Sequence, residues 1–289
     1  MTRRGNLHLM LKKKLFVVIG PTAVGKTDYA ISLALKFGSP VISCDSRQIY
    51  KELKIGTAPP TLEQLLAVKH YFIFSHSIHD YYTAGKYEVE ALALLEELFK
   101  THDSLVMAGG SGLYVDAVCR GIDNFPATDI ALRELLMQRL ANEGLESLRM
   151  ELKLLDRESY EAIDIANPQR VVRALEVSLQ TGEKFSSFKS YQSKSRDFEI
   201  EKILIERPRE ELYERINRRV ELMMENGLLD EVRALYEFRE RPALKTVGYR
   251  ELFGYLDGKY SLDDAVGLIK RNSRRYAKRQ MTWWRRNEA

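Results

Sequence analysis

Residues 20–27 read GPTAVGKT, the Gly-x-x-x-x-Gly-Lys-Thr pattern of a phosphate-binding loop. The glycines let backbone N–H groups close around an anion, and the start of the helix that follows favours negative charge. The lysine supplies a charge for the outer phosphate, and the final threonine hydroxyl can bind Mg2+. The predicted phosphate-binding residues are Gly20, Pro21, Thr22, Ala23, Val24, Gly25, Lys26 and Thr27, with Thr27 also the expected metal ligand.

The loop pattern does not show which ligand binds, because it occurs in ATP-binding and other nucleotide-binding proteins and also in enzymes that bind other phosphates. An ATP hydrolase usually adds an apolar strand that ends in an aspartate for the metal. The apolar run at residues 104–108 ends instead in Gly109 and Gly110, whereas PVISCD at residues 40–45 ends in Asp45. Asp45 follows the loop's own helix directly, an order that favours a small kinase or a related group-transfer enzyme.

Asp45 ends a predicted strand beside the loop, where open α/β sheets place their ligands. A carboxylate there can bind a metal through water, accept a proton from an attacking nucleophile, or pair with Arg47 or a backbone amide. Arg47 and Gln48 extend a polar rim next to the phosphate site.

The elements that position these residues alternate between strand and helix patterns. We predict strands at residues 15–19, 40–45, 70–74, 104–110 and 202–206, and helices at 26–37 and 84–100. This alternation predicts an α/β fold, a parallel sheet flanked by helices. Between residues 129 and 194 the strand patterns stop, and Asn167 followed by Pro168 indicates a helix start. We therefore predict a P-loop core at 1–128 and 195–289, interrupted by an all-helical insertion domain at 129–194.

The composition of the chain limits the classes of protein to which it can belong. The chain has 289 residues, 45% hydrophobic and 30% charged, with a formal net charge of +4, which fits a globular protein of one or two domains. Two cysteines are too few for a disulfide scaffold. No apolar run approaches the roughly 18 residues that span a bilayer, so we expect a cytoplasmic protein with no membrane partner.

Several motifs in order resemble those of the tRNA dimethylallyltransferases. They are GPTAVGKT, VISCDSRQIY (41–50), IGTAPP (55–60), AGGSGLYVDAV (108–118), NPQRVVRALEV (167–177), VGYRE (247–251) and YAKRQMTWWR (276–285). The resemblance covers nearly all of the chain from residue 15. It implies a P-loop nucleotidyl-kinase-like core with a helical insertion, and transfer of a dimethylallyl group from dimethylallyl diphosphate to an adenine amine. That adenine lies 3′ of the anticodon in tRNAs that read codons beginning with U.

Three residues are the expected catalytic groups. Asp45 is the predicted general base for the adenine amine, in agreement with the resemblance. The resemblance also implies that Arg215 approaches the diphosphate, and that the hydroxyl of Ser111 bonds near the reacting centre, where the family usually has threonine. Ser111 keeps that hydroxyl but could instead satisfy a local turn, and Arg215 could lie on a solvated face.

The partner implied is the tRNA anticodon stem-loop. The basic tail at residues 270–286 contains no acidic residue, which suits phosphate contacts. The expected tRNA-binding residues are Asp45, Ser46, Arg47, Gln48, Arg133, Gln169, Arg170, Val171, Val172, Arg173, Lys245, Thr246, Val247, Gly248, Tyr249, Arg250, Arg274 and Lys278. Each arginine could equally be a solvated surface charge. The resemblance implies a monomer, and no protein partner is evident.

Three alternatives stay open from the sequence. A small-molecule kinase of the nucleotide or shikimate type would share the loop and the core, but would not need the basic tail. An RNA-binding module with a vestigial loop would not need both the intact GKT and Asp45. A prenyltransferase acting on free adenine nucleotides would not need a basic tail either. No Cys/His cluster has zinc spacing, so Mg2+ is the only expected metal.

Overall fold

The computed structural model describes residues 12–190 and 192–286, which form two compact units. One unit is Gly121–Lys194, and the other is the rest of the described chain. Across the described residues, no helix combines the length and apolar character needed to span a bilayer.

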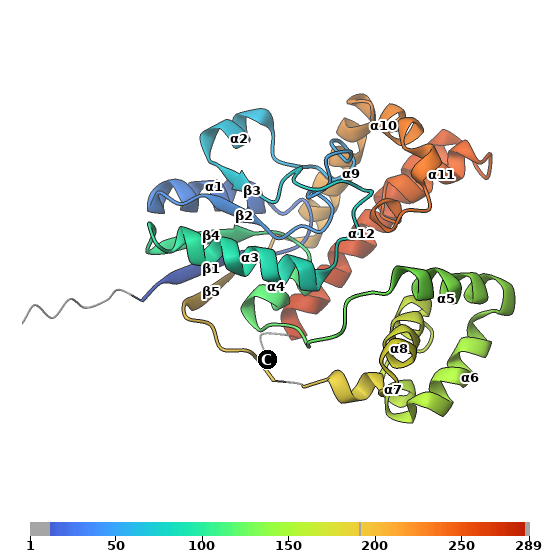
Figure 1. Ribbon diagram of the computed structural model, residues 1–289. Helices are drawn as coiled ribbons and strands as arrows, with labels where there is room; N and C mark the ends of the chain where they lie inside the picture. The colour runs from blue at the N-terminus through green and yellow to red at the C-terminus, as the bar shows by residue number, and fades with distance from the viewer. Residues whose placement is uncertain (1–11, 191, 287–289) are drawn as a thin grey trace, which may run out of the picture. The chain divides into compact units, whose positions relative to one another are not determined.

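The larger unit is built on a five-stranded parallel sheet with the order β3-β2-β4-β1-β5 (Figure 1). Its strands are β1 (Lys14–Ile19), β2 (Val41–Ser43), β3 (His70–Tyr71), β4 (Ser104–Ala108) and β5 (Glu199–Leu204). The predicted α/β class is thereby confirmed. Because β1 lies in the sheet interior, between β4 and β5, the loop that follows it opens at the carboxyl edge.

Both faces of the sheet are covered, as the alternation of side chains along β1 requires. Leu15 and Val17 pack in one core with helices α3 (Ala84–Leu98) and α4 (Gly112–Cys119). Phe16 and Val18 pack on the opposite face against α1 (Lys26–Phe37).

The strands differ from their predicted bounds for local reasons. β3 ends at Tyr71 because Phe72 and Phe74 adopt positive φ angles of 60° and 51°, which break an extended strand. β2 ends before Asp45, whose side chain accepts hydrogen bonds from the next turn. β5 begins at Glu199, earlier than predicted, because it pairs with β1 from Lys14 onward.

Helices complete the larger unit and bring its carboxyl-terminal half to the loop. They are α2 (Leu62–Ala67), α9 (Arg209–Glu225), α10 (Leu228–Ala234), α11 (Tyr249–Leu256) and α12 (Leu262–Arg286), with short turns η2 (Tyr236–Phe238) and η3 (Pro242–Leu244). Helices α9 and α12 pack together, and Ile216 and Ala277 from these helices share a small core with Val24 of the loop. Both helices therefore lie against the phosphate-binding loop.

The smaller unit is entirely helical in its described residues. It contains α5 (Ile130–Glu143), α6 (Leu145–Leu155), α7 (Arg157–Ala162), α8 (Pro168–Thr181) and η1 (Phe185–Phe188). Leu136, Leu148 and Leu175 are fully buried in its core. The predicted start of α8 is confirmed, because the Asn167 side chain accepts hydrogen bonds from the first-turn amides and Pro168 occupies the first turn.

Candidate active site

The phosphate-binding loop depends on two glycines with positive φ angles. Gly20 has a φ of 148°, and a Cβ there would lie 2.6 Å from the carbonyl oxygen of Ile205. Gly25 has a φ of 106° and caps the amino terminus of α1. A side chain at Gly20 would therefore collide with the backbone that follows β5, so the loop needs glycine here for close backbone approach.

Three cations converge on this loop. Lys26 Nζ donates to the carbonyl oxygen of Pro21 at 2.7 Å. Arg215 Nε donates to the carbonyl oxygen of Ala23 at 2.8 Å, and Arg219 Nη2 donates to the hydroxyl of Thr22 at 2.6 Å. Arg215 and Arg219 lie four residues apart on α9 and so project from the same face of that helix.

Burial affects the charge of two of these groups. Burial and repulsion from Arg219 lower the pKa of Lys26 to about 8, although Asp45 opposes the shift. Burial also lowers the pKa of Arg219 to about 10, with attraction from Asp45 opposing it and Arg215 adding repulsion. Both shifts arise chiefly because burial disfavours the charged form, and a bound anion would stabilise the two cations in this desolvated site.

Gln280 joins helix α12 to the loop. Its Oε1 accepts from the backbone N–H of Thr22 at 2.8 Å, and its Nε2 donates to the carbonyl oxygen of Gly110 at 2.8 Å. A Cβ on Gly110 would lie 2.3 Å from that amide nitrogen. The glycine after β4 is therefore needed for this bridge between the loop, β4 and α12.

Asp45 is held by the turn that it begins. Its Oδ1 accepts from the backbone N–H groups of Arg47 at 2.8 Å and Gln48 at 3.3 Å. The structure gives Oδ2 no hydrogen-bond partner among residues 12–190 and 192–286, so that oxygen can accept a proton from a substrate. Asp45 thus makes the pairing with backbone amides that the sequence allowed, and its other carboxylate oxygen stays available for a substrate.

Ser111 supports the same turn. Its hydroxyl oxygen accepts from the backbone N–H of Ser46 at 2.9 Å, and its hydroxyl donates to the Ser46 side chain at 3.0 Å. The Ser111 backbone N–H also donates to the carbonyl oxygen of Cys44 at 3.3 Å. Ser111 therefore fixes the segments on both sides of Asp45.

The loop, the α9 arginines and Asp45 line one cavity of about 610 Å3, which also includes Thr27. Within the described residues, no group of three or more His, Cys, Asp or Glu could hold a metal ion. The oxygen donors that are present, the Thr27 hydroxyl and the Asp45 carboxylate, fit Mg2+. This ion keeps several waters and binds through few protein ligands plus substrate phosphates.

Comparison with known proteins identifies the family of this chain. A family model described as IPP transferase matches residues 48–287. The chain belongs to the IPP transferase family. The relative named tRNA dimethylallyltransferase 1 from Bacteroides fragilis is 52% identical over 279 residues, which cover 96% of this chain and 93% of the relative. The resemblance inferred from the sequence motifs is thus confirmed.

Two solved structures share the fold of this IPP transferase. The full-length tRNA isopentenylpyrophosphate transferase from Bacillus halodurans matches with a TM-score of 0.66 and 35% identity, over 95% of this chain and 87% of that chain. A eukaryotic dimethylallyltransferase, described as acting on tRNA, matches with a TM-score of 0.77 and 26% identity, over 94% of this chain and 69% of that chain.

The expected RNA-contacting residues of the larger unit differ in their exposure and contacts. Lys278 and Arg250 are exposed, and Arg47 donates to the carbonyl oxygen of Pro242 at 3.4 Å, near the 245–250 segment. Arg274 instead faces α9, where it donates to Asn217 Oδ1 at 2.7 Å. Ser46 and Gln48 stay in the Asp45 turn, and Thr246, Val247 and Gly248 precede α11, whose amino terminus Glu251 caps.

Tyr249 requires a correction among these residues. Its side chain is fully buried, and its hydroxyl donates to Glu231 Oε1 at 2.6 Å. The side chain therefore supports the segment from inside and cannot itself contact RNA. Lys245 lies 3.2 Å from Glu240 in an exposed ion pair, which leaves it accessible.

In the smaller unit, a buried carboxylate organises the predicted contact residues. Glu176 is fully buried and forms ion pairs with Arg133, at 2.6 Å, and with Arg173. Arg133 also donates to Gln169 Oε1 at 3.1 Å, whereas Arg170 is exposed. Val171 and Val172, which were expected to bind tRNA, are fully buried, and their side chains pack in the core instead.

Arg219 and Gln280 line the cavity and hydrogen-bond to Thr22 of the loop, and sequence reasoning missed both. Arg218 and Arg219 lie close to Arg215 in the sequence, and only the packing of α9 shows which of these arginines reach the loop. Gln280 lies in the tail motif, and no local pattern indicates that its amide bridges two distant loops.

Proposed function

We propose that this IPP transferase transfers a dimethylallyl group from dimethylallyl diphosphate to the exocyclic amine of the adenosine 3′-adjacent to the anticodon in tRNAs that read codons beginning with U. The observation that carries the proposal is that one cavity contains both the phosphate-binding loop and Asp45. An anion site and a carboxylate in one cavity suit a reaction that releases diphosphate and deprotonates an amine.

The donor's diphosphate would lie in the loop at residues 20–27. Lys26, Arg215 and Arg219 converge there and would stabilise the charge that develops on the leaving oxygen. Mg2+, held by the Thr27 hydroxyl and phosphate oxygens, would supply further charge neutralisation when bound. The loop is therefore a cradle for a leaving group and need not bind ATP.

The acceptor would approach Asp45. As the donor C–O bond breaks, the allylic carbon gains positive character, and the adenine amine nitrogen forms the new C–N bond. Asp45 would accept the proton lost by that nitrogen, through the oxygen that the turn leaves without a partner. Ser111 would act as a positioning residue, because it holds the Ser46 segment next to Asp45.

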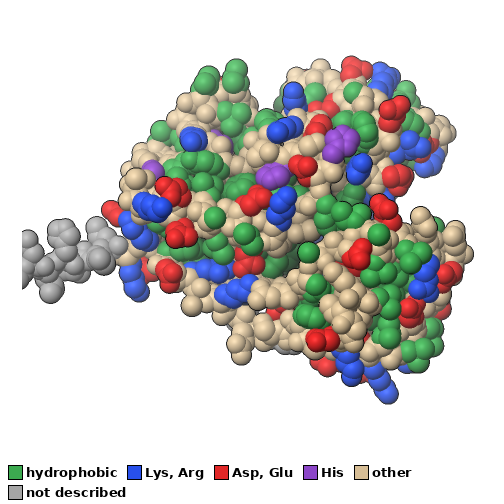
Figure 2. Space-filling view, viewed as in Figure 1, with side chains coloured by type: hydrophobic (Ala, Val, Ile, Leu, Met, Phe, Trp, Pro, Cys, Tyr) green, Lys and Arg blue, Asp and Glu red, His purple; other side chains and the backbone are tan. Residues whose placement is uncertain are grey.

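The tRNA would be bound by exposed basic side chains. On the face shown in Figure 2, Lys and Arg side chains are interspersed with Asp and Glu, so that face offers no extended basic surface. Lys278 and Arg250 in the larger unit, and Arg170 in the smaller one, remain exposed and suit phosphate contacts. We therefore propose the helical unit as a tRNA-contacting insertion domain.

The target adenine must leave the base stack to reach a cavity of this kind, at a cost of a few kcal/mol that contacts around the flipped base would offset. We propose that the enzyme works as a monomer in the cytoplasm.

An acceptor-competition assay tests this proposal. The protein is incubated with magnesium, labelled dimethylallyl diphosphate and either tRNA, AMP or no acceptor. Label in tRNA alone supports the proposal. Label in AMP would favour the free-nucleotide prenyltransferase, and ATP turnover without prenyl transfer would favour the kinase.

A further inference from the structure

A carboxylate outside the cavity of Asp45 holds part of the wall of that cavity. Glu231 lies on α10, is partly buried, and is not among the residues that line the cavity. Its Oε2 accepts from the backbone N–H groups of Lys54 and Ile55, both at 2.8 Å, and its Oε1 accepts from that of Gly56 at 3.1 Å. One side chain therefore satisfies three consecutive backbone donors of a loop that is distant in the sequence.

This loop leads directly into the cavity. Thr57, Ala58 and Pro59 follow Gly56 and line the cavity together with Asp45. Ala58 has a φ angle of 47°, in the left-handed region that residues with a side chain rarely adopt. Such a conformation persists only where the surrounding contacts fix it, so the anchoring of the loop determines where this part of the wall lies.

The turn that holds Asp45 anchors the other end of the loop. Gln48 Nε2 donates to the carbonyl oxygens of Thr57 at 3.2 Å and Ala58 at 2.9 Å. The backbone N–H of Gln48 donates to Asp45 Oδ1 at 3.3 Å. The wall is thus connected through one residue to the proposed general base, and a shift of the loop would be felt at that carboxylate.

Glu231 also contacts the segment at residues 245–250, which is expected to bind tRNA. The Tyr249 hydroxyl donates to Glu231 Oε1 at 2.6 Å, and a Cβ on Gly56 would lie 2.6 Å from the Tyr249 ring. The loop backbone therefore lies against that ring and needs glycine at this position. Because Arg250 in the same segment is exposed, one carboxylate joins an accessible basic segment to the cavity wall.

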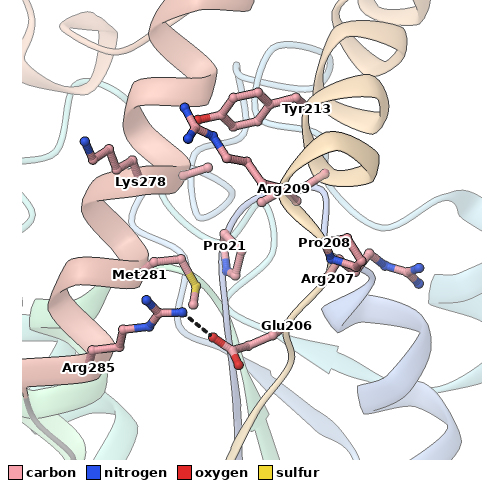
Figure 3. A pocket seen from close by; sticks show the side chains of 11 residues that line it. Pro21, Glu206, Arg207, Pro208, Arg209, Tyr213, Lys278, Met281 and Arg285 are labelled. Atoms are coloured by element: carbon pink, nitrogen blue, oxygen red, sulfur yellow. Dashed lines mark hydrogen bonds and ion pairs between the residues drawn. The ribbon is translucent and has the colours of Figure 1, made fainter.

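The loop does not reach the neighbouring cavity. That cavity, of about 550 Å3, lies between α9 and α12 and is lined by residues such as Pro21, Tyr213 and Met281 (Figure 3). Neither Glu231 nor any of residues 54–59 is among its lining residues. A change at Glu231 would therefore act on the cavity of Asp45.

We propose, resting on the function proposed above, that Glu231 is a positioning residue for prenyl transfer. By fixing three backbone N–H groups it sets the place of residues 57–59 beside Asp45, and through Tyr249 it ties this wall to the segment proposed to bind tRNA. Helices α9 and α12 hold the diphosphate cradle instead, so Glu231 acts on the geometry of the acceptor and the base. A misplacement of about 1 Å between reacting groups can lower a rate about 10²-fold.

The test measures prenyl transfer and diphosphate binding separately. With saturating tRNA and dimethylallyl diphosphate, Glu231→Ala should lower kcat about 10- to 100-fold, because it loses all four hydrogen bonds. Glu231→Gln should lower kcat less, because its amide oxygen can still accept from two backbone N–H groups. Calorimetric titration with inorganic diphosphate and Mg2+ should give both variants an affinity within about threefold of the parent. Hydrogen exchange of the amides of residues 54–56 should be faster in Glu231→Ala.

The matched control is Asp230→Asn, which removes the adjacent carboxylate of α10 and its exposed ion pair with Arg233; kcat and the exchange at residues 54–56 should be unchanged. Thermal denaturation verifies that each variant is folded, and Glu231→Gln provides the kcat and exchange comparison if Glu231→Ala does not fold.

The proposal is overturned if the folded variants keep the kcat of the parent, or if the exchange at residues 54–56 does not change. It is equally overturned if diphosphate binding is lost in parallel with kcat, because Glu231 would then support the fold as a whole. A parent enzyme that transfers no prenyl group to tRNA would refute the proposed function itself, which is a different outcome from an active parent with unaffected variants.

Discussion

Arg219→Met is the perturbation that tests the anion site most sharply. Two unit charges about 4 Å apart interact by about 4 kcal/mol at an effective dielectric constant near 20. Because Arg219 is only half-buried, we expect about 2–3 kcal/mol of lost transition-state stabilisation, or a roughly 30- to 150-fold fall in kcat/KM for dimethylallyl diphosphate. Affinity for tRNA should not change.

The same substitution should also change how kcat/KM depends on pH. Burial and the charge of Arg219 lower the pKa of Lys26 to about 8. In the free enzyme Lys26 is therefore charged below about pH 8 and neutral above it, so kcat/KM for the donor should fall as the pH rises through 8. Removing Arg219 removes the repulsion, raises the pKa of Lys26 and shifts this alkaline limb to higher pH.

The assay is initial-rate prenyl transfer to saturating tRNA, across donor concentrations and from pH 6.5 to 10. Arg233→Met is the control, because Arg233 is an exposed arginine of α10 that pairs with Asp230 and does not line the cavity. We expect it to change kcat/KM less than about threefold. An Arg219→Met enzyme that keeps kcat/KM within threefold, with an unmoved alkaline limb, would refute the reasoning.

Three further predictions concern the base, the RNA surface and the helical unit. Asp45→Asn should lower the rate of prenyl transfer roughly 10²- to 10⁴-fold with tRNA affinity nearly intact by filter binding; a collapse of tRNA affinity would make Asp45 a recognition residue. Lys278→Ala should weaken tRNA binding and reduce its salt slope by about one, whereas Arg274→Ala, which loses a part-buried hydrogen bond to Asn217 of α9, should lower thermal stability more than it changes that slope. Glu176→Gln should destabilise the helical unit by about 2–3 kcal/mol, because it leaves two arginines without their buried partner; unchanged hydrogen exchange in α5 and α8 would contradict this.

The parallel α/β core could be predicted from the sequence, because its signals are local. The apolar run at residues 15–19 predicts a strand, the pattern at residues 20–27 predicts a tight turn and a helix start, and Asn167 with Pro168 marks the start of α8. The end of β3 could not be predicted, because HYFIF is apolar throughout while Phe72 turns the chain with a positive φ angle.

The residues of the candidate site likewise differ in whether the sequence could predict them. Lys26 and Asp45 belong to contiguous motifs, whereas Arg219 and Gln280 reach the loop only through the packing of α9 and α12 across more than half of the chain. Burial likewise separates Tyr249 from its exposed neighbour Arg250, although both lie in one basic segment. Side-chain contacts between distant segments leave no periodic trace in a single sequence.

The central claim is tested most directly by mapping the product on tRNA. A tRNA that reads codons beginning with U, and that lacks prenyl groups, is incubated with the enzyme and dimethylallyl diphosphate, then digested and analysed by mass spectrometry. The account predicts one prenylated adenosine, at the position 3′ of the anticodon, and equimolar release of diphosphate. An unmodified tRNA, or prenyl groups at other positions in comparable amounts, would contradict it.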